Sequence, residues 1–286
     1  MLVQRVITAI VLLAVLLGAL LAPGPWPLVT LLTIAAACAL WEWLRLTWPR
    51  KPTLMPLVAA LILLAAMVVL AMQWLAPAVS SWAADIQSIV NHWLMPLVVL
   101  VWVLAATGLV IQGDASPQKG SAGLSLFGIL AVVAVWAALV QLFLAHGAWF
   151  LVSLLALIWF ADIAAYFTGK AFGKRKLAPK VSPGKTWEGA IGGVLAATLW
   201  VACSAGWEGS FGFVLRQNWS WPGVIAIAVV LAALSIIGDL FESLLKRRAG
   251  VKDSSRLLPG HGGVYDRIDA LLPVAPIALL LTGVQF

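Results

Sequence analysis

The sequence predicts an all-α, polytopic integral membrane protein with about nine transmembrane helices and a cytoplasmic N-terminus. Hydrophobic residues make up 63% of the 286 residues and charged residues only 10%, and the mean hydropathy is +1.04. Soluble domains contain about 25% charged residues, so a soluble globular protein is excluded. The apolar runs are continuous and long, which is typical of transmembrane helices and unlike the alternating short strands of a membrane barrel.

Nine apolar segments are expected to cross the bilayer. The first follows Arg5; a signal peptide is the alternative, but the run is long for one and no A-x-A cleavage site follows. Pro23-Gly24-Pro25 then turns the chain, a polar loop at 76–93 precedes the fourth span, and His146-Gly147 joins the fifth and sixth spans as a hairpin. The expected spans are Val6–Leu21, Trp26–Leu46, Leu54–Leu75, Leu94–Ile111, Leu124–Ala145, Ala148–Gly169, Trp187–Gly206, Val224–Leu245 and Ala270–Gln285.

The basic residues support this orientation. With a cytoplasmic N-terminus and nine alternating spans, 17 of the 18 Lys and Arg residues lie on the cytoplasmic side and only Arg216 lies outside, as the positive-inside rule requires. The net charge of +7 is therefore a topology signal, and no nucleic-acid partner is expected. Two charged loops, 170–185 and 246–269, fall on the same side. Cys38 and Cys203 lie in apolar runs without paired spacing, so neither a disulfide nor a metal framework is expected.

Acids within two of the apolar segments indicate function. Asp162 lies within IWFADIAAYFTGK, where an ionisable side chain costs several kcal/mol to insert; a functional role is favoured over a structural contact with a neighbouring helix. Asp239, Glu242, Ser243 and Lys246 share one face of the eighth span at i, i+3, i+4 and i+7. This stripe predicts a site for a hard cation and a phosphate. A Glu242–Lys246 pair at i, i+4 is the alternative for Glu242, but it leaves Asp239 unexplained.

The segment before the last span combines acids with glycines. Asp266 and Asp269 lie at i, i+3, beside His261-Gly262-Gly263. One of the two acids could simply stabilise the start of the helix. Two carboxylates together suit Mg²⁺, which binds one or two carboxylates and keeps positions for water and substrate phosphates. The glycines allow backbone N–H groups to approach an anion. His261 alone would more often be structural.

The basic loop between the sixth and seventh spans, Lys170–Glu188, contains Gly184-Lys185-Thr186. It is not a P-loop, because position 179 is Pro instead of Gly and we expect no strand before it. Its six cations, together with Ser182 and Thr186, suit polyphosphate or an anionic headgroup. The positive-inside rule alone would explain the cations, but it would not explain the Ser-Pro-Gly-Lys-Thr-Trp sequence.

The stretch from Ser243 to Asp269 follows the pattern S-x-L-K-R-x4-K-D-x-S-x2-L-P-x-H-G-G-V-x-D-R-I-D without departure. This pattern resembles the signature of the phosphatidate cytidylyltransferases, also called CDP-diacylglycerol synthases. The segments 162–169, 176–189 and 238–243 and the early Trp41-Glu42-Trp43 also resemble bacterial members of that family. The likeness covers essentially the whole chain, and its most specific part is the final third.

The resemblance implies an enzyme that joins CTP and phosphatidic acid into CDP-diacylglycerol and pyrophosphate, with Mg²⁺ and a second cation as a further option. It implies a single transmembrane domain, with N-terminal helices at 1–121 and a catalytic part at 148–286, in the bacterial inner membrane with a cytoplasmic active site. The oligomeric state is left open, with a homodimer as one candidate. The metal ligands would be Asp239, Asp266 and Asp269, and the further catalytic residues Ser243, Lys246, Lys252, Asp253 and His261. The substrate-binding residues would be Asp162, Lys180, Ser182, Lys185, Thr186, Arg247 and Arg267.

Three other functions are weighed against this one. Another CTP-dependent lipid enzyme or a lipid kinase is the nearest; the CDP-alcohol phosphotransferases are disfavoured, because their D-G-x2-A-R…G-x3-D-x3-D spacing is absent. A secondary transporter could also bury Asp162 and Asp239, but such proteins commonly show paired halves, and this chain has no visible repeat. A structural scaffold would leave the clustered acids without a purpose.

Overall fold

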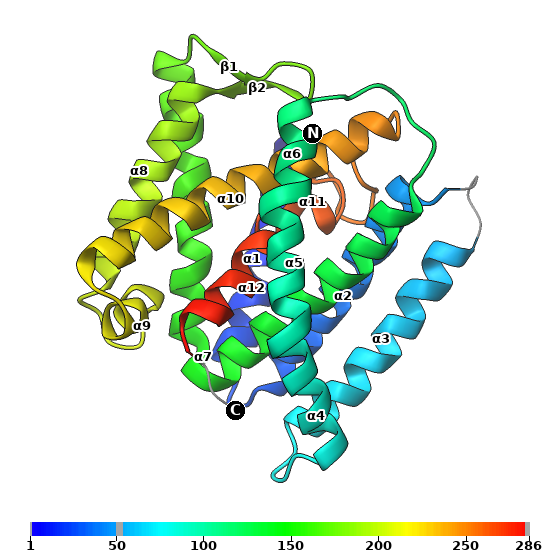
Figure 1. Ribbon diagram of the computed structural model, residues 1–286, viewed down its shortest axis with the longest axis vertical. Coiled ribbons are helices and arrows are strands. Elements are labelled where there is room, and N and C mark those ends of the chain that lie inside the picture. The colour runs from blue at the N-terminus through cyan, green and yellow to red at the C-terminus, as the bar shows by residue number, and fades with distance from the viewer. Residues whose placement is uncertain (1, 50–53, 284–286) are drawn as a thin grey trace. The chain divides into compact units, whose positions relative to one another are not determined.

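The computed structural model describes residues 2–49 and 54–283 (Figure 1). Arg50 and Lys51 of the charge count and Gln285 of the ninth predicted span lie outside the described residues. The elements are α1 Leu2–Leu21, α2 Trp26–Thr47, α3 Met55–Trp74, α4 Ser81–Ile89, η1 Val90–Leu94, α5 Met95–Val101, η2 Trp102–Ala106, α6 Thr107–Gln112, α7 Ala122–Phe172, β1 Lys176–Ala178, β2 Ser182–Thr186, α8 Trp187–Ser204, α9 Phe211–Asn218, α10 Trp221–Arg248, α11 Tyr265–Ile268 and α12 Leu271–Leu281. Apart from one short hairpin, the regular structure of the described residues is helical.

Six helical segments of the described chain are long and apolar enough to cross a membrane: Trp26–Thr47, Met55–Trp74, Ser81–Gln112, Ala122–Phe172, Trp187–Ser204 and Trp221–Arg248. Two further apolar helices, Val6–Leu21 and Leu271–Leu281, are shorter. The prediction of an all-α membrane protein is confirmed. The count of nine spans and the side of the N-terminus stay predictions.

The break predicted at His146-Gly147 is present. α7 runs over 51 residues, but Gly147 has φ 82° and ψ −173°, so two helical segments meet there. A straight helix of this length would extend about 75 Å, far beyond the roughly 30 Å of the hydrocarbon core. A positive φ is accessible to glycine without strain, so the sequence supplies the residue that the break requires.

Two segments differ from the expectation. The predicted polar loop at 76–93 is mostly helical, because α4 begins at Ser81 and continues through the π-helical segment η1. Polar residues such as Asp85 and Gln87 do not interrupt a helix that lacks internal Gly or Pro. The predicted basic loop contains the antiparallel strands β1 and β2, so the expectation of no strand before Gly184 was wrong. The P-loop remains excluded by Pro179.

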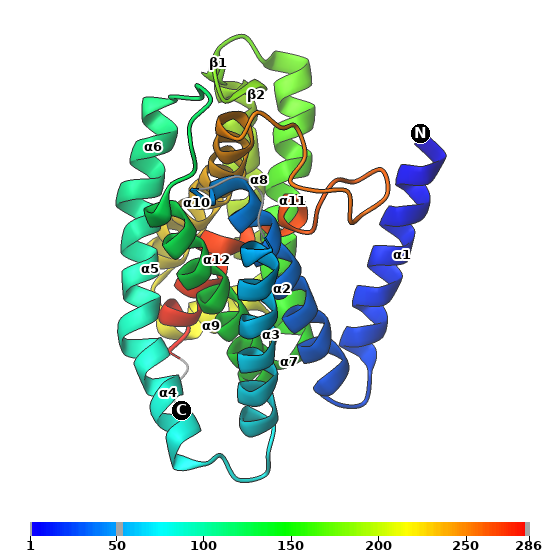
Figure 2. The same ribbon diagram turned by 90° about the vertical axis from the view of Figure 1, so that its right-hand side faces the viewer.

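The chain divides into two compact units. Unit 1 consists of Met1–Val98, Ser116–Val140 and Leu245–Ile268, and unit 2 of Val99–Ala115, Gln141–Leu244 and Asp269–Phe286. In unit 1, α2 packs beside α1 and α3 (Figure 2). Trp43 of α2 lies between Phe127 and Tyr265, with ring centroids 5.7 and 5.1 Å apart. The close approach of Trp43 to α7 requires a glycine at 128, because a Cβ there would overlap the indole ring.

In unit 2, α8 packs closely against the second segment of α7 through small residues. A Cβ at Gly189 would lie 2.8 Å from the carbonyl oxygen of Ala165, and one at Gly193 would lie 2.7 Å from that of Ala161. Small residues at this spacing let helix backbones approach each other in a membrane. The β1–β2 hairpin packs against α8, at the upper end of that helix in Figure 1.

Candidate active site

Three acids of unit 2 form a group that could hold a metal ion, here called the acid group: Asp239 and Glu242 on α10, and Asp269 just before α12. One carboxylate oxygen from each lies within 4.8 Å of the others. The spacing of Asp239 and Glu242 places both on one helix face. Gly238 allows the third acid to approach, because a Cβ there would lie 2.5 Å from the carbonyl oxygen of Asp269. Oxygen donors of this kind suit a hard divalent cation.

The electrostatics of the acid group favour a bound cation. Burial raises the pKa of the Asp269 carboxyl well above its usual range, and the nearby Asp239 carboxylate raises this pKa further. Carboxylates that share a site repel one another when ionised. A divalent cation relieves that repulsion by contacting all of them. A bound metal ion therefore explains the arrangement better than contacts among the acids alone do.

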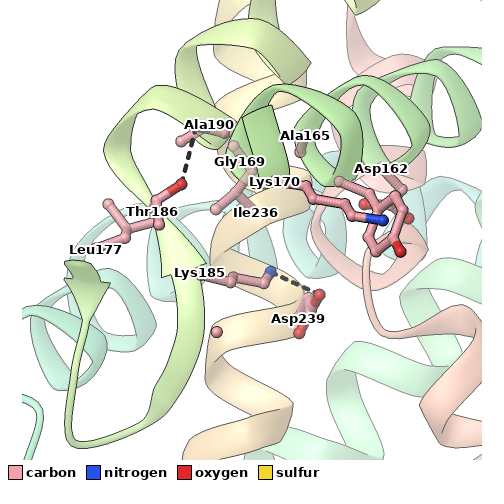
Figure 3. A pocket seen from close by; sticks show the side chains of 13 residues that line it. Asp162, Ala165, Gly169, Lys170, Leu177, Lys185, Thr186, Ala190, Ile236 and Asp239 are labelled. Atoms are coloured by element: carbon pink, nitrogen blue, oxygen red, sulfur yellow. Dashed lines mark hydrogen bonds and ion pairs between the residues drawn. The ribbon is translucent and has the colours of Figure 1, made fainter. Parts of the chain in front are cut away.

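The β1–β2 hairpin is joined to the acid group by one ion pair. Lys185 of β2 places Nζ 2.6 Å from Oδ2 of Asp239, and Figure 3 shows the two side chains pointing toward each other. Both residues line a cavity of about 510 Å³ that Asp162, Tyr166 and Lys170 also line. The structure therefore brings together Asp162, Lys185 and Asp239, which lie far apart in the sequence.

Four other predicted residues of unit 2 have different surroundings. Thr186 also lines this cavity, but its Oγ1 accepts a hydrogen bond from Gly189 N at 3.1 Å and so caps the start of α8. Lys180 and Ser182 are not among the described residues that line the cavity. Ser243 donates a long hydrogen bond of 3.5 Å to Oδ1 of Asp239. The substrate roles predicted for these residues stay predictions.

In unit 1, the carboxylate of Asp266 organises the segment between α10 and α11. Its Oδ1 lies 2.7 Å from Nζ of Lys246. Its Oδ2 accepts hydrogen bonds from Gly263 N at 2.7 Å, from Ser254 Oγ at 2.9 Å and from Ser254 N at 3.1 Å. Asp266, which we also predicted to bind metal, is thus surrounded by protein donors. A role for it in metal binding stays a prediction.

The same segment of unit 1 encloses a polar cavity of about 620 Å³, here called the basic cavity. Its charged and titratable lining residues include Lys252, Asp253, Arg256, His261 and Arg267. The guanidinium Nη2 of Arg267 donates to the carbonyl oxygen of His261 at 2.8 Å, which fixes the side chain at the edge of the cavity. Three cations around one hollow suit phosphate groups. Arg247, in the last turn of α10, lines neither cavity.

Two acids were not among the residues assigned a catalytic, substrate or metal role from the sequence. Glu242 is part of the acid group, although its spacing from Lys246 favoured a local ion pair as an alternative. Glu42 is fully buried and contacts the segment that carries Asp266. A lone acid between two tryptophans in an apolar helix was the available signal, because such a residue is costly unless it is paired.

The fold and these clusters define the class: an α-helical integral membrane protein with an acid group suited to a cation and a basic cavity suited to phosphates. Comparison with known proteins identifies the family. The model of the Cytidylyltransferase family matches residues 3–284, and the chain belongs to this family.

Several curated relatives share one name. A phosphatidate cytidylyltransferase of Haemophilus influenzae is 36% identical over 96% of this chain and 96% of its own length. One of Pseudomonas aeruginosa is 40% identical over 97% of this chain and 95% of its own length. One of Thermotoga maritima is 42% identical over 43% of this chain and 45% of its own length. The resemblance inferred from the sequence pattern is confirmed.

Proposed function

We propose that this protein transfers the cytidylyl group of CTP to phosphatidate, giving CDP-diacylglycerol and pyrophosphate. The full-length similarity to phosphatidate cytidylyltransferases carries this proposal. In the reaction, a phosphate oxygen of phosphatidate forms a bond to the α-phosphorus of CTP. The bond from that phosphorus to the bridging oxygen of the β-phosphate breaks, and pyrophosphate leaves. Such a reaction needs little besides positioning and neutralisation of phosphate charge.

The acid group fits the metal that this chemistry calls for. Asp239, Glu242 and Asp269 supply three carboxylates, and oxygen ligands of this kind suit Mg²⁺. When bound, the cation would neutralise charge on the phosphoryl oxygens and hold them for in-line attack. Since Mg²⁺ is usually held by only one or two carboxylates, three acids leave room for a second cation.

The cations divide between the two units. In unit 2, Lys185 lines the cavity beside Asp239 and would orient a substrate phosphate there, and Asp162, which lines the same cavity, would contact another part of the substrate. In unit 1, Lys246, held by Asp266, and the cations of the basic cavity would bind further phosphates. Ser243 and His261 would orient substrate or bound water. Asp253 would help to position the other residues that line the basic cavity. The remaining substrate contacts are assigned to Lys180, Ser182, Thr186 and Arg247.

The proposed setting is the bacterial inner membrane. Nine spans with a cytoplasmic N-terminus place both charged loops at the cytoplasmic surface, where CTP from the cytosol and phosphatidate from the leaflet meet. The catalytic part is 148–286, and a homodimer is the oligomeric state to test. Cysteine labelling from each side of the membrane at positions near Arg216 and Lys180 tests the topology, since the two should label from opposite sides.

The activity test uses purified full-length protein in vesicles that contain phosphatidate, with Mg²⁺ and CTP labelled in the cytidine. Labelled CDP-diacylglycerol and an equal amount of pyrophosphate are expected. A kinase would transfer only phosphate and leave the lipid without cytidine label, and a carrier would move substrate without converting lipid. Folded protein that forms no cytidine-labelled lipid would contradict the proposal.

A further inference from the structure

Glu42 of α2 is a buried carboxylate that binds a segment more than 200 residues away. Its side chain is fully buried. Oε1 accepts hydrogen bonds from Ser255 Oγ at 2.5 Å and Val264 N at 3.1 Å. Oε2 accepts from Ser254 Oγ at 3.0 Å and Tyr265 N at 2.6 Å. Each oxygen therefore lies within hydrogen-bond distance of one serine hydroxyl and one backbone N–H, so donors occupy both oxygens of the carboxylate.

This pattern is specific for a carboxylate. The serine hydroxyls can rotate, but the N–H groups of Val264 and Tyr265 can only donate. A glutamine at position 42 has one acceptor oxygen and one donor nitrogen, so its NH₂ group faces an N–H whichever way the amide is turned. Gly263 completes the fit, because a Cβ there would overlap Ser254 Oγ and Glu42 Oε2.

The hydrogen bonds continue from Glu42 to a cation. Ser254 Oγ lies 3.0 Å from Glu42 Oε2 and 2.9 Å from Asp266 Oδ2, so its single hydroxyl proton is shared between the two carboxylates. The other oxygen of Asp266 lies 2.7 Å from Lys246 Nζ, and the side chains of Lys246 and Asp266 are only 15% and 7% exposed. Ser254 is thus the link between Glu42 and the ion pair. Ser255 also binds Glu42, but its other hydrogen bond is from Leu257 N at 3.0 Å.

We propose that Glu42 is a positioning residue that holds the Lys246 ammonium in place through Ser254 and Asp266. All four side chains belong to unit 1. The proposal rests on the proposed function, since Lys246 is there assigned to a substrate phosphate. The new element is that Glu42 of α2 determines the position of the Lys246 ammonium. Loss of Glu42 should therefore weaken binding of the substrate that Lys246 contacts.

Neighbouring serines provide a matched pair of variants. Ser254→Ala and Ser255→Ala each remove one hydroxyl that donates to Glu42, but only Ser254→Ala removes the link to Asp266. The test measures kcat and KM for CTP and for phosphatidate in the full chain, for both variants, Glu42→Gln and Lys246→Gln. Lys246→Gln identifies the substrate whose KM depends on the ammonium.

The expected result is a change in KM for that one substrate. Ser254→Ala and Glu42→Gln should raise it about tenfold, as expected for loss of one hydrogen bond to a charged group, and should leave the KM of the other substrate unchanged. Ser255→Ala should change the same KM much less. If Ser254→Ala and Glu42→Gln lower only kcat, or if Ser255→Ala matches Ser254→Ala, the proposal is overturned.

A second measurement does not depend on turnover. Modification of lysines by an amine-reactive reagent, followed by mass spectrometry, reports the exposure of Lys246 directly. Lys246 should react several-fold faster in Ser254→Ala than in wild type, and at the wild-type rate in Ser255→Ala. Equal rates in wild type and Ser254→Ala would overturn the positioning role. Lack of cytidylyl transfer by the wild type would instead contradict the proposed function. If Glu42→Gln fails to fold, the comparison of the two serine variants still tests the positioning role.

Discussion

The carboxylates of the two units are arranged in opposite ways. In unit 1, Glu42 and Asp266 are surrounded by donors: backbone N–H groups, serine hydroxyls and the Lys246 ammonium. In unit 2, Asp239, Glu242 and Asp269 face one another, with oxygens within 4.8 Å, although Asp239 also pairs with Lys185. A carboxylate whose lone pairs are filled by the protein fixes a loop, whereas carboxylates that crowd together need a cation. The partners of an acid therefore indicate its role better than its position in a sequence pattern does.

The largest effect is expected in the acid group. Asp239→Asn and Asp269→Asn keep the shape of each side chain but remove the charge, so each should lower kcat by roughly 100-fold or more, as loss of a metal ligand or of charge stabilisation does. Initial rates over a wide range of Mg²⁺ concentration measure this. Recovery of wild-type kcat at high Mg²⁺ would remove the residue from the metal site.

Asp266→Asn tests the other half of the comparison, the carboxylate that is surrounded by donors in unit 1. The amide can accept at one position only, so either the Lys246 pair or the bonds from Gly263 N and Ser254 are lost. Breaking a buried pair by removal of one charge costs about 3–5 kcal/mol. We therefore expect a clear drop in thermal stability together with lower activity. Unchanged thermal unfolding would contradict the anchoring role.

An intermediate effect is expected at the hairpin. Lys185→Met removes the ion pair with Asp239 and one cation of the cavity, and should lower kcat/KM by roughly 10- to 100-fold, in the range of a charged hydrogen bond. Lys176→Met is the matched control, because Lys176 is exposed on the neighbouring strand β1 and does not line the cavity. Equal losses in both variants would show that only the net charge of the hairpin matters.

The metal requirement should depend on pH. Because burial and Asp239 raise the pKa of Asp269, protons compete with the cation for this carboxyl at higher pH than for an ordinary aspartate. Below that pKa the group must lose a proton before it binds metal, so apparent Mg²⁺ affinity should fall by up to about tenfold per pH unit. Metal titrations of the rate at several pH values measure this. A constant half-saturating Mg²⁺ concentration between pH 8 and pH 5 would contradict it.

The smallest effect is expected at Glu188. Its exposed carboxylate accepts hydrogen bonds from Lys174 N at 3.1 Å and Arg175 N at 3.2 Å, which ties the start of the hairpin to α8. Glu188→Ala should lower activity only a few-fold, since exposed contacts of this kind contribute little. Faster proteolysis of the hairpin should accompany the loss. A loss as large as that of Lys185→Met would assign Glu188 a direct role.

Local patterns in the sequence were sufficient for much of the fold. Long apolar runs predicted the helices, Gly147 predicted the break in α7, and helical spacing placed Asp239 and Glu242 on one face. The β1–β2 hairpin was missed, because its strands of three and five residues are too short and too polar to show a periodic pattern.

The contacts between distant segments could not be predicted in this way. Helical spacing offered Glu242 as a partner for Lys246, but it gave no sign that Lys246 also pairs with Asp266, 20 residues further along. Glu42 binds Ser254 across 212 residues, and no local pattern encodes such a contact. Asp266 and Asp269 were predicted to act together as neighbours at i, i+3; the contacts of Asp266 are with loop donors, while Asp269 belongs to the acid group.

Metal binding by the acid group is tested most directly with Mn²⁺, which can replace Mg²⁺ at oxygen sites and is observed by electron paramagnetic resonance. Purified wild-type protein should bind Mn²⁺ in competition with Mg²⁺, and Asp239→Asn and Asp269→Asn should each lose that binding while their helix content is unchanged. Wild-type Mn²⁺ affinity in both folded variants would contradict the assignment of the metal to this group.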